Sequence, residues 1–192
     1  MLLRPLTVAD EIAAIRAHEA LANENFPFLF DFQLNDSFSA YVRRVDAFND
    51  GGPFFTEGGV PGIFLVAECE GEIVGRLSVR YELNAYLREY GGHVGYCVLP
   101  EFRRRGHGTE MLAAGLDLLW RRGLDRALLT CDDDNVGSIA VIERAGGSYA
   151  KTIPGDQEGG ADKRHYLFSR DSSPATLRSL KNPIVSPQGQ KA

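Results

Sequence analysis

The residues best suited to chemistry lie between Gly92 and Gly108, where the chain reads G-H-V-G-Y-C-V-L-P-E-F-R-R-R-G-H-G. Pro100 ends a strand-like run, and three consecutive arginines then precede Gly106 and Gly108. Glycine lets backbone N–H groups approach an anion closely, and the N-terminus of a following helix adds partial positive charge. Arginine contributes forked donors that match phosphate oxygens. This order of residues therefore predicts a site for a phosphate-bearing ligand.

The two common nucleotide-binding patterns are missing from this stretch. Gly106-His107-Gly108 is followed by Thr-Glu-Met, so no G-x-G-x-x-G forms, and G-x-x-x-x-G-K-[ST] does not occur either. An arginine run is often only a solvated surface, and two glycines can form a simple turn. The specific signal is the complete order V-x-P-x-x-R-x-x-G-x-G between a strand and a helix.

A second patterned block lies downstream. Asn135-x-x-Ser138 opens the helix-like run N-V-G-S-I-A-V-I-E-R-A, which ends at Gly146-Gly147. Three acids, Asp132 to Asp134, precede it and could bind a metal or act as bases. Acids in this place more often stabilise the N-terminus of the helix. We therefore expect no metal site here.

Together the two blocks resemble the cofactor motifs of the GNAT superfamily of N-acetyltransferases. Further runs, such as L-N-A-Y-L and L-T-C-D-D-D-N, resemble a bacterial branch of predicted acetyltransferases. The resemblance implies that Asn135 hydrogen-bonds the pantetheine arm of acetyl-CoA or an ordered water near it, and that the small Ser138 lets the thiol end pass the helix. It also implies a loop that holds the pyrophosphate, made of Arg103, Arg104, Arg105, Gly106, His107, Gly108 and Thr109.

The same resemblance implies acetyl transfer from acetyl-CoA to a primary amine of a small molecule or peptide, by direct attack in a ternary complex. Backbone groups near Tyr96 and Val98 would pair with pantetheine, and the Val98 N–H would polarise the thioester carbonyl. The tyrosine that the family often carries seven residues after the motif Asn is replaced by Ile142. Tyr96 shares a strand face with Val94 and Val98, so it is the candidate proton donor, with core packing as its alternative.

Three further residues near this strand are weighed as candidates. Arg80 and Glu82 close the preceding strand and could handle an acceptor, without a decisive argument for either. His93 points away from Tyr96 if the strand is regular, and we interpret it as a structural histidine.

Two other classes of function compete with the enzyme. A non-catalytic acyl-CoA-binding sensor with the same fold is suggested by Ile142. A nucleic-acid-binding domain is suggested only by the arginines at 103–105 and 121–122, and the formal net charge of -5 weighs against it.

Composition indicates one globular domain. The chain has 192 residues, of which 44% are hydrophobic, enough for a sizeable core. Cys69, Cys97 and Cys131 lie in apolar runs without C-x-x-C spacing, so we expect buried free thiols in a reducing cytoplasm. No signal peptide and no membrane-spanning run is apparent, and a homodimer is left open.

The periodicities and the resemblance together predict an α/β fold of the α+β type. The resemblance implies the GNAT fold, a mixed sheet of about seven strands with a splay between strands four and five, flanked by about four helices. Thr7-x-x-Asp10 predicts the start of the first helix. The other helices are expected at Ser37–Asn49, Gly108–Arg122 and Asn135–Ala145, and a short helical turn at Leu83–Tyr90. The strands are expected at Leu2–Pro5, Ile63–Cys69, Ile73–Tyr81, His93–Val98, Arg126–Cys131, Ser148–Ile153 and Lys163–Ser169.

Three segments fall between or beyond these elements. The aromatic run Asn23–Leu34 is interpreted as a loop that packs into the core, with an apolar lip for the acceptor as its alternative. Asp50–Gly62 carries five glycines and two prolines and is a loop or a lid. Composition changes at Asp171, so we expect an N-acetyltransferase domain over residues 1–170 and a flexible tail over 171–192.

Overall fold

The computed structural model describes residues 1–24, 26–33, 35–52, 59–155 and 160–171. Its strands form two antiparallel sheets, one in the order β1-β2-β3-β4 and the other in the order β5-β7-β6. Their bounds are β1 Leu2–Arg4, β2 Gly62–Cys69, β3 Glu72–Arg80, β4 Val94–Val98, β5 Arg126–Asp132, β6 Ser148–Ile153 and β7 Lys163–Ser169. The predicted strands are therefore confirmed, and they differ from the expected bounds by a residue at some ends.

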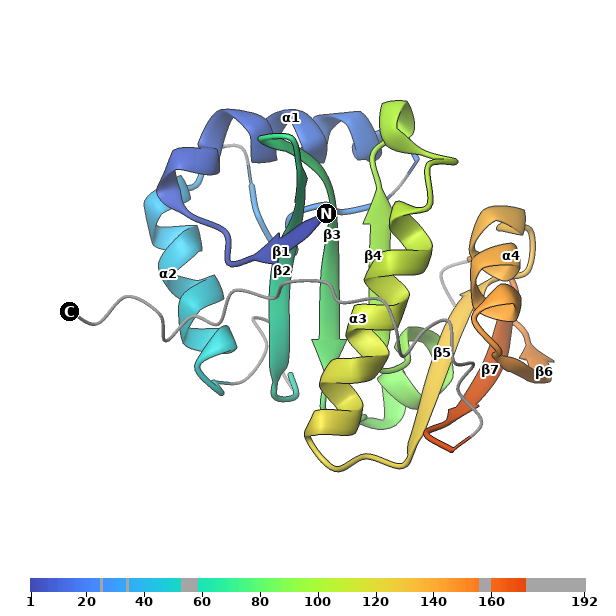
Figure 1. The fold of residues 1–192 in the computed structure, drawn as a ribbon. Helices are drawn as coiled ribbons and strands as arrows, with labels where there is room; N and C mark the ends of the chain where they lie inside the picture. The colour runs from blue at the N-terminus through green and yellow to red at the C-terminus, as the bar shows by residue number, and fades with distance from the viewer. Residues whose placement is uncertain (25, 34, 53–58, 156–159, 172–192) are drawn as a thin grey trace.

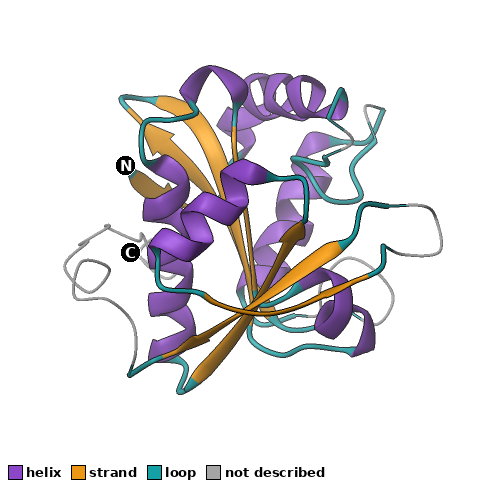
Figure 2. Ribbon diagram, turned by 90° about the vertical axis from the view of Figure 1, so that its right-hand side faces the viewer, coloured by secondary structure: helices purple, strands orange, loops and turns teal. Residues whose placement is uncertain are grey.

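Helices cover both sides of these strands (Figure 2). In Figure 1, α3 runs beside β4, α4 lies over the smaller sheet, α1 crosses the top of the larger sheet and α2 lies at its left side. Their bounds are α1 Glu11–Ala22, α2 Phe38–Asn49, α3 His107–Arg121 and α4 Val136–Arg144, with short turns η1 Val8–Asp10, η2 Leu87–Gly91 and η3 Pro100–Phe102. Within the described residues, no helix combines the length and the apolar character needed to cross a membrane.

Strand β2 shows how one sheet serves two cores. Ile63, Leu65 and Ala67 belong to the core shared with α3, whereas Phe64 and Val66 belong to the core shared with α1 and α2. Successive strand residues point to opposite faces, so a nearly continuous apolar run is what a strand covered on both faces requires.

Local signals fix the ends of several elements. Ser37 caps α2 by accepting the Ala40 N–H, and Gly123, with φ of 87°, follows the last turn of α3. Glu70 and Gly71 both have positive φ, 53° and 85°. Positive φ at both central residues is the two-residue turn whose twist matches an antiparallel hairpin, so β2 and β3 pair directly.

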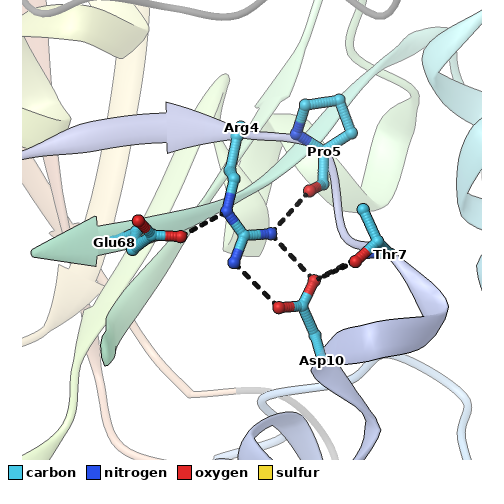
Figure 3. Close-up of polar contacts among 5 residues, drawn as sticks. All are labelled: Arg4, Pro5, Thr7, Asp10 and Glu68. Carbon is cyan, nitrogen blue, oxygen red and sulfur yellow. Dashed lines mark hydrogen bonds and ion pairs between the residues drawn. The ribbon is translucent and has the colours of Figure 1, made fainter. Parts of the chain in front are cut away.

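A partly buried charge cluster ties the first helix to the sheet (Figure 3). The Arg4 Nε donates to Glu68 at 2.6 Å, and its two terminal nitrogens donate to the Asp10 carboxylate at 2.8 Å. The Thr7 N–H and hydroxyl also donate to Asp10, both at 2.8 Å, which confirms the predicted helix start. Burial alone would raise the pKa of Asp10, but the hydrogen bonds from Arg4 and Thr7 outweigh it and lower that pKa.

The predicted splay separates β4 from β5. The two strands meet at His93, whose N–H donates to the Leu128 carbonyl at 2.7 Å and whose Nδ1 accepts the Leu128 N–H at 2.9 Å. Beyond this point β4 pairs with β3 and β5 pairs with β7, so the described strands leave a gap between the two sheets. His93 is half-buried, and its backbone contacts agree with the structural role expected for it.

One expectation needs adjustment, and two fall outside the described residues. The helical turn expected at Leu83–Tyr90 is a π-helical turn at Leu87–Gly91, a form common beside functional sites. The loop Asp50–Gly62 lies outside the described residues at 53–58, and the expected tail lies outside them at 172–192.

Candidate active site

A cavity of about 230 Å³ opens where β4 and β5 separate. Its wall is formed by β3, β4, β5, the start of α4, the π-helical turn and the segment between α1 and α2. The lining residues are Phe26, Pro27, Phe30, Arg76, Arg80, Tyr90, Gly91, Val94, Gly95, Tyr96, Leu129, Thr130, Cys131, Asp132, Asn135, Ser138, Ile142 and Lys163.

The cavity reaches both faces of the larger sheet. Val94 and Tyr96 belong with the core under α3, whereas Cys97 belongs with the core under α1 and α2. Gly95 lies on the second face too, because a Cβ built there would meet the Arg80 guanidinium at 3.2 Å. One opening can therefore bring a ligand from the α3–α4 side into contact with another from the α1–α2 side.

The backbone of β4 offers unpaired groups to the gap. Its register pairs Gly95 with Ser78 and Cys97 with Arg76, while Leu99 donates to the Val74 carbonyl at 2.9 Å. In an antiparallel pair, bonded and non-bonded residues alternate, so the N–H groups of the residues between these point away from β3. Those are the N–H groups of Tyr96 and Val98, which face the position where a next strand would bind.

The loop before α3 has the shape of an anion cradle. Arg104 and Gly106 have positive φ, 62° and 91°, and alternate with residues of ordinary conformation. Such alternation turns successive N–H groups toward a single concavity. Within the described residues, no backbone acceptor pairs with the N–H groups of residues 104–109, although Glu110 donates to the Gly106 carbonyl. These donors and the start of α3 form a site suited to phosphate.

The three arginines of the loop have different surroundings. Arg103 forms an ion pair with Glu24 at 2.6 Å, and its Nε donates to the Val98 carbonyl at 3.1 Å. Arg105 donates to the Glu101 carbonyl at 3.1 Å. Arg104 is exposed. The loop thus presents its backbone to the concavity, while two of the predicted arginines contact other parts of the protein.

Tyr96 places a buried hydroxyl in the cavity wall. Within the described residues this hydroxyl has no hydrogen-bond partner of ordinary geometry. Burial raises the pKa of Tyr96, and the nearby Ser138 side chain offsets the rise only in part. The phenol ring also lies against the start of α3, because a Cβ built at Gly108 would be 3.4 Å from it. Tyr96 is therefore a protonated donor beside both motif blocks.

The second motif block forms the opposite wall. Asn135 caps α4 by accepting the Ser138 N–H at 2.9 Å, so its Oδ1 is used within the helix cap. Ile142, one turn further along α4, is 1% exposed and lines the cavity. The position has no hydroxyl to offer, whereas the tyrosines Tyr90 and Tyr96 are both part of the lining.

The cysteines are free thiols, as expected, but only Cys97 is buried, whereas Cys69 and Cys131 are partly exposed. Cys131 is half-buried because it borders the gap. Burial, followed by the nearby Asp132 charge, raises the pKa of the Cys131 thiol to about 11.

The acids before α4 do not gather around an ion. Asp132 forms an ion pair with Lys163 across β5 and β7. Within the described residues, no group of three or more His, Cys, Asp or Glu side chains is arranged to hold a metal. Glu82 is exposed and absent from the cavity lining, whereas Arg80 is part of it.

Several lining residues were missed from the sequence. Phe28 and Phe32 pack into the core as predicted, but Phe26 and Phe30 of the same run line the cavity. Arg76 was also missed. Its signal was present, because Arg76, Ser78 and Arg80 recur with period two in an otherwise apolar strand.

Solved structures of acetyltransferases share this fold. Mycobacterium smegmatis RimJ in complex with CoA-disulfide matches with a TM-score of 0.65 and 20% identity, over 90% of this chain and 83% of that one. An acetyltransferase from Salmonella typhimurium, solved with its cofactor acetyl-CoA, matches with a TM-score of 0.58 and 18% identity, over 87% and 92%. At these identities the likeness concerns the fold.

Proteins that resemble this chain in sequence are also acetyltransferases. A mycothiol acetyltransferase of Clavibacter michiganensis is 43% identical over 63 residues, which cover 31% of this chain and 21% of that protein. An acetyltransferase of Photorhabdus laumondii is 34% identical over 84 residues, 44% of this chain and 55% of that protein. The chain therefore spans less than two thirds of these relatives. The model of the acetyltransferase (GNAT) family matches residues 15–147, which confirms the resemblance drawn from the two motifs, and the chain belongs to that family.

Proposed function

We propose that the protein transfers the acetyl group of acetyl-CoA to a primary amine of a small molecule or peptide, by direct attack in a ternary complex. The observation that carries the proposal is the continuity of three features: the N–H cradle at 104–109, the gap-facing N–H groups of β4, and the cavity beyond them. Their order matches a ligand with a phosphate end, an amide-bearing arm and a reactive tip.

The cosubstrate would lie along this path. The pyrophosphate would bind the N–H groups of residues 104–109, and pantetheine would pair with the backbone of β4 near Tyr96 as an added strand, which leaves the Val98 N–H for the thioester carbonyl. The solved Salmonella typhimurium relative, which contains acetyl-CoA, supports this cosubstrate. The acetyl group would then enter the cavity between Tyr96 and Ser138.

The chemistry needs one bond formed and one broken. The neutral amine attacks the thioester carbonyl, and the Val98 N–H stabilises the oxyanion that develops. The C–S bond then breaks, and the Tyr96 hydroxyl supplies the proton that the leaving sulfur takes up. The amine loses its proton to water and water returns a proton to the Tyr96 phenolate, so the acetylated amine and free CoA are the products.

Ile142 also motivates a second function, a non-catalytic acyl-CoA-binding sensor. Its side chain is buried at the position where the family often carries a tyrosine. Release of free thiol from acetyl-CoA in the presence of a panel of amines separates the two functions. A sensor would bind acetyl-CoA and leave the thioester intact with each amine.

The proposal also covers the compartment and the oligomeric state of the protein. The free thiols Cys69, Cys97 and Cys131 suit a reducing compartment such as the cytoplasm. A homodimer stays a prediction, which sedimentation of the purified protein would test.

The experiment for the cosubstrate site uses two glycines in matched conformations. Gly106 and Gly123 have φ of 91° and 87°, and a Cβ built at either meets no atom within 4 Å. An alanine at either position should therefore cost a similar roughly 1–2 kcal/mol of backbone strain. By calorimetry, Gly106→Ala should weaken acetyl-CoA binding about tenfold or more, because it misaligns donors to a charged group, and Gly123→Ala should not. Equal affinities in both folded variants would exclude the loop as the phosphate site.

A further inference from the structure

Two arginines of β3 reach the same wall of the cavity. Arg76 is 1% exposed, and Arg80 lies four residues further along the same strand face. Asp132 is the only carboxylate among the described residues that line the cavity, and it is ion-paired with Lys163. The α1–α2 side of the cavity therefore carries two positive charges without a protein carboxylate against them.

Arg76 is held by the protein itself. Its Nε donates to the Phe28 carbonyl at 2.9 Å, one terminal nitrogen donates to the Pro27 carbonyl at 2.8 Å, and the other to the Ser78 hydroxyl at 3.3 Å. Its guanidinium stacks on the Phe30 ring, 3.9 Å from the ring centre. These contacts fix the aromatic segment over the cavity and keep the Arg76 charge in place.

Arg80 has much weaker contacts. One terminal nitrogen lies 3.5 Å from the Gly91 carbonyl, at the limit of a hydrogen bond, and no acceptor among the described residues pairs with its other two nitrogens. The guanidinium lies against Gly95, where a Cβ would meet its two terminal nitrogens at 3.2 and 3.7 Å. Most of its fork is thus free to bind a ligand, beside the strand residue that precedes Tyr96.

The electrostatics favour an anion at this place. Burial and then the charge of Arg76 lower the pKa of Arg80 to about 10. A charge taken out of water is costly unless it is paired, so a bound anion would offset this cost. A carboxylate meets a guanidinium through two parallel hydrogen bonds. The cavity volume of about 230 Å³ restricts the partner to a small molecule or a chain end.

We propose that Arg80 binds a carboxylate of the acceptor, so that the amine acetylated by this protein belongs to a small, amino-acid-like molecule. The inference rests on the proposed acetyl transfer and specifies its acceptor. A carboxylate at Arg80 places the rest of the molecule against Gly95, directed toward Tyr96, with Phe26 and Phe30 available to its apolar part.

The test compares L-amino acids with their own carboxamides as acceptors. In the wild type, kcat/KM should favour the carboxylate form by about 30-fold or more, because an unpaired buried charge is left when the carboxylate is removed. Arg80→Gln should abolish this preference by lowering kcat/KM for the carboxylates and leaving that for the amides. Arg122→Gln is the matched control, because Arg122 is an exposed arginine stacked on Tyr81, outside the cavity lining.

Two further variants test the same preference in case Arg80→Gln does not fold. Gly95→Ala introduces a methyl group that would lie 3.0 Å from the Ser78 hydroxyl and 3.2 Å from a terminal nitrogen of Arg80, so it displaces the flexible Arg80 head group and should reduce the same preference. Arg80→Lys should retain part of it, since the charge stays and the fork is lost.

Two readouts separate the outcomes. Amides used as well as acids, a preference for phosphorylated amines, or a preference that survives in Arg80→Gln would overturn the acceptor assignment while acetyl transfer stands. If no amine is turned over, the melting temperature of the CoA-bound protein decides. A rise with amino acids in the wild type but not in Arg80→Gln supports the carboxylate site, and no rise overturns it.

Discussion

At the scale of single residues, Tyr96 has a feature that should lower stability but could raise the reaction rate. Its hydroxyl is buried without a partner of ordinary geometry, and burial raises its pKa. A buried unsatisfied hydroxyl costs about 1–3 kcal/mol of stability, while a positioned acid contributes about 10²–10⁴-fold to a rate. Tyr96 is thus explained better by the reaction than by the stability of the fold.

Replacing Tyr96 by phenylalanine separates these contributions. We expect Tyr96→Phe to raise the melting temperature, because it removes the unsatisfied hydroxyl, and to lower kcat at least about tenfold with unchanged acetyl-CoA affinity. Burial raises the pKa of Tyr96 above its ordinary value of about 10, so the hydroxyl stays protonated across the neutral range and the profile of kcat against pH should drop there without changing shape. An unchanged kcat with a higher melting temperature would assign Tyr96 to core packing.

Cys131 also borders the cavity, but its thiol should stay out of the reaction. With a pKa of about 11, little of it is the nucleophilic thiolate near neutral pH. Cys131→Ala should therefore leave kcat unchanged, and mass spectrometry after a single turnover should find no acetyl group on any cysteine. An acetyl-cysteine adduct would instead indicate a two-step transfer through a cysteine and would exclude direct attack.

At the scale of elements, the charge cluster of Arg4 and Asp10 positions α1 on the sheet (Figure 3). Asp10→Asn should lower the free energy of unfolding by about 2–3 kcal/mol at pH 7, because it leaves Arg4 with one acidic partner. The folded-state pKa of Asp10 lies below its unfolded value, so this stability is present above pH ~4 and lost as the pH falls through the folded pKa.

Denaturant unfolding at pH 7 and at pH 3 measures this effect. The difference between wild type and variant should shrink at the lower pH. Asp117→Asn is the control, since Asp117 forms an exposed i,i+4 pair with Arg121 that contributes little. An equal loss in both variants would mean that the cluster at Asp10 is no stronger than a surface pair.

The elements themselves could be predicted because their signals are local. Ser37 and Asn135 cap helices, Gly123 ends one, and the period-two or continuous apolar runs mark strands. The two cofactor motifs could be placed for the same reason, because each spans only a few consecutive residues at the start of a helix.

The remaining parts of the site depend on contacts between distant residues. Arg103 pairs with Glu24, which is 79 positions away, so its side chain could not be assigned from the loop alone. Arg76 donates to the carbonyls of Phe28 and Pro27, which are 48 and 49 positions away in the sequence. The π-helical form of Leu87–Gly91 is likewise held by outside partners, such as the Thr130 hydroxyl on the Tyr90 carbonyl at 2.7 Å.

At the scale of the whole molecule, the residue that follows the last strand is hydrogen-bonded back to the residue before β5. The Arg170 N–H donates to the Asp125 carbonyl at 3.0 Å, directly after β7. We expect a chain that ends at Asp171 to keep the melting temperature and acetyl-CoA affinity of the full chain. A large loss of either would show that residues 172–192 contribute to the domain or to a partner subunit.

The gap between β4 and β5 gives neighbouring amide protons of one strand opposite exposures to solvent. The N–H groups of Gly95 and Cys97 face β3, and those of Tyr96 and Val98 face the gap. In the free protein, hydrogen–deuterium exchange along β4 should therefore alternate between slow and fast from one residue to the next. A ligand that completes the ladder would slow exchange at Tyr96 and Val98 alone, so the disappearance of this alternation would report occupancy of the gap residue by residue.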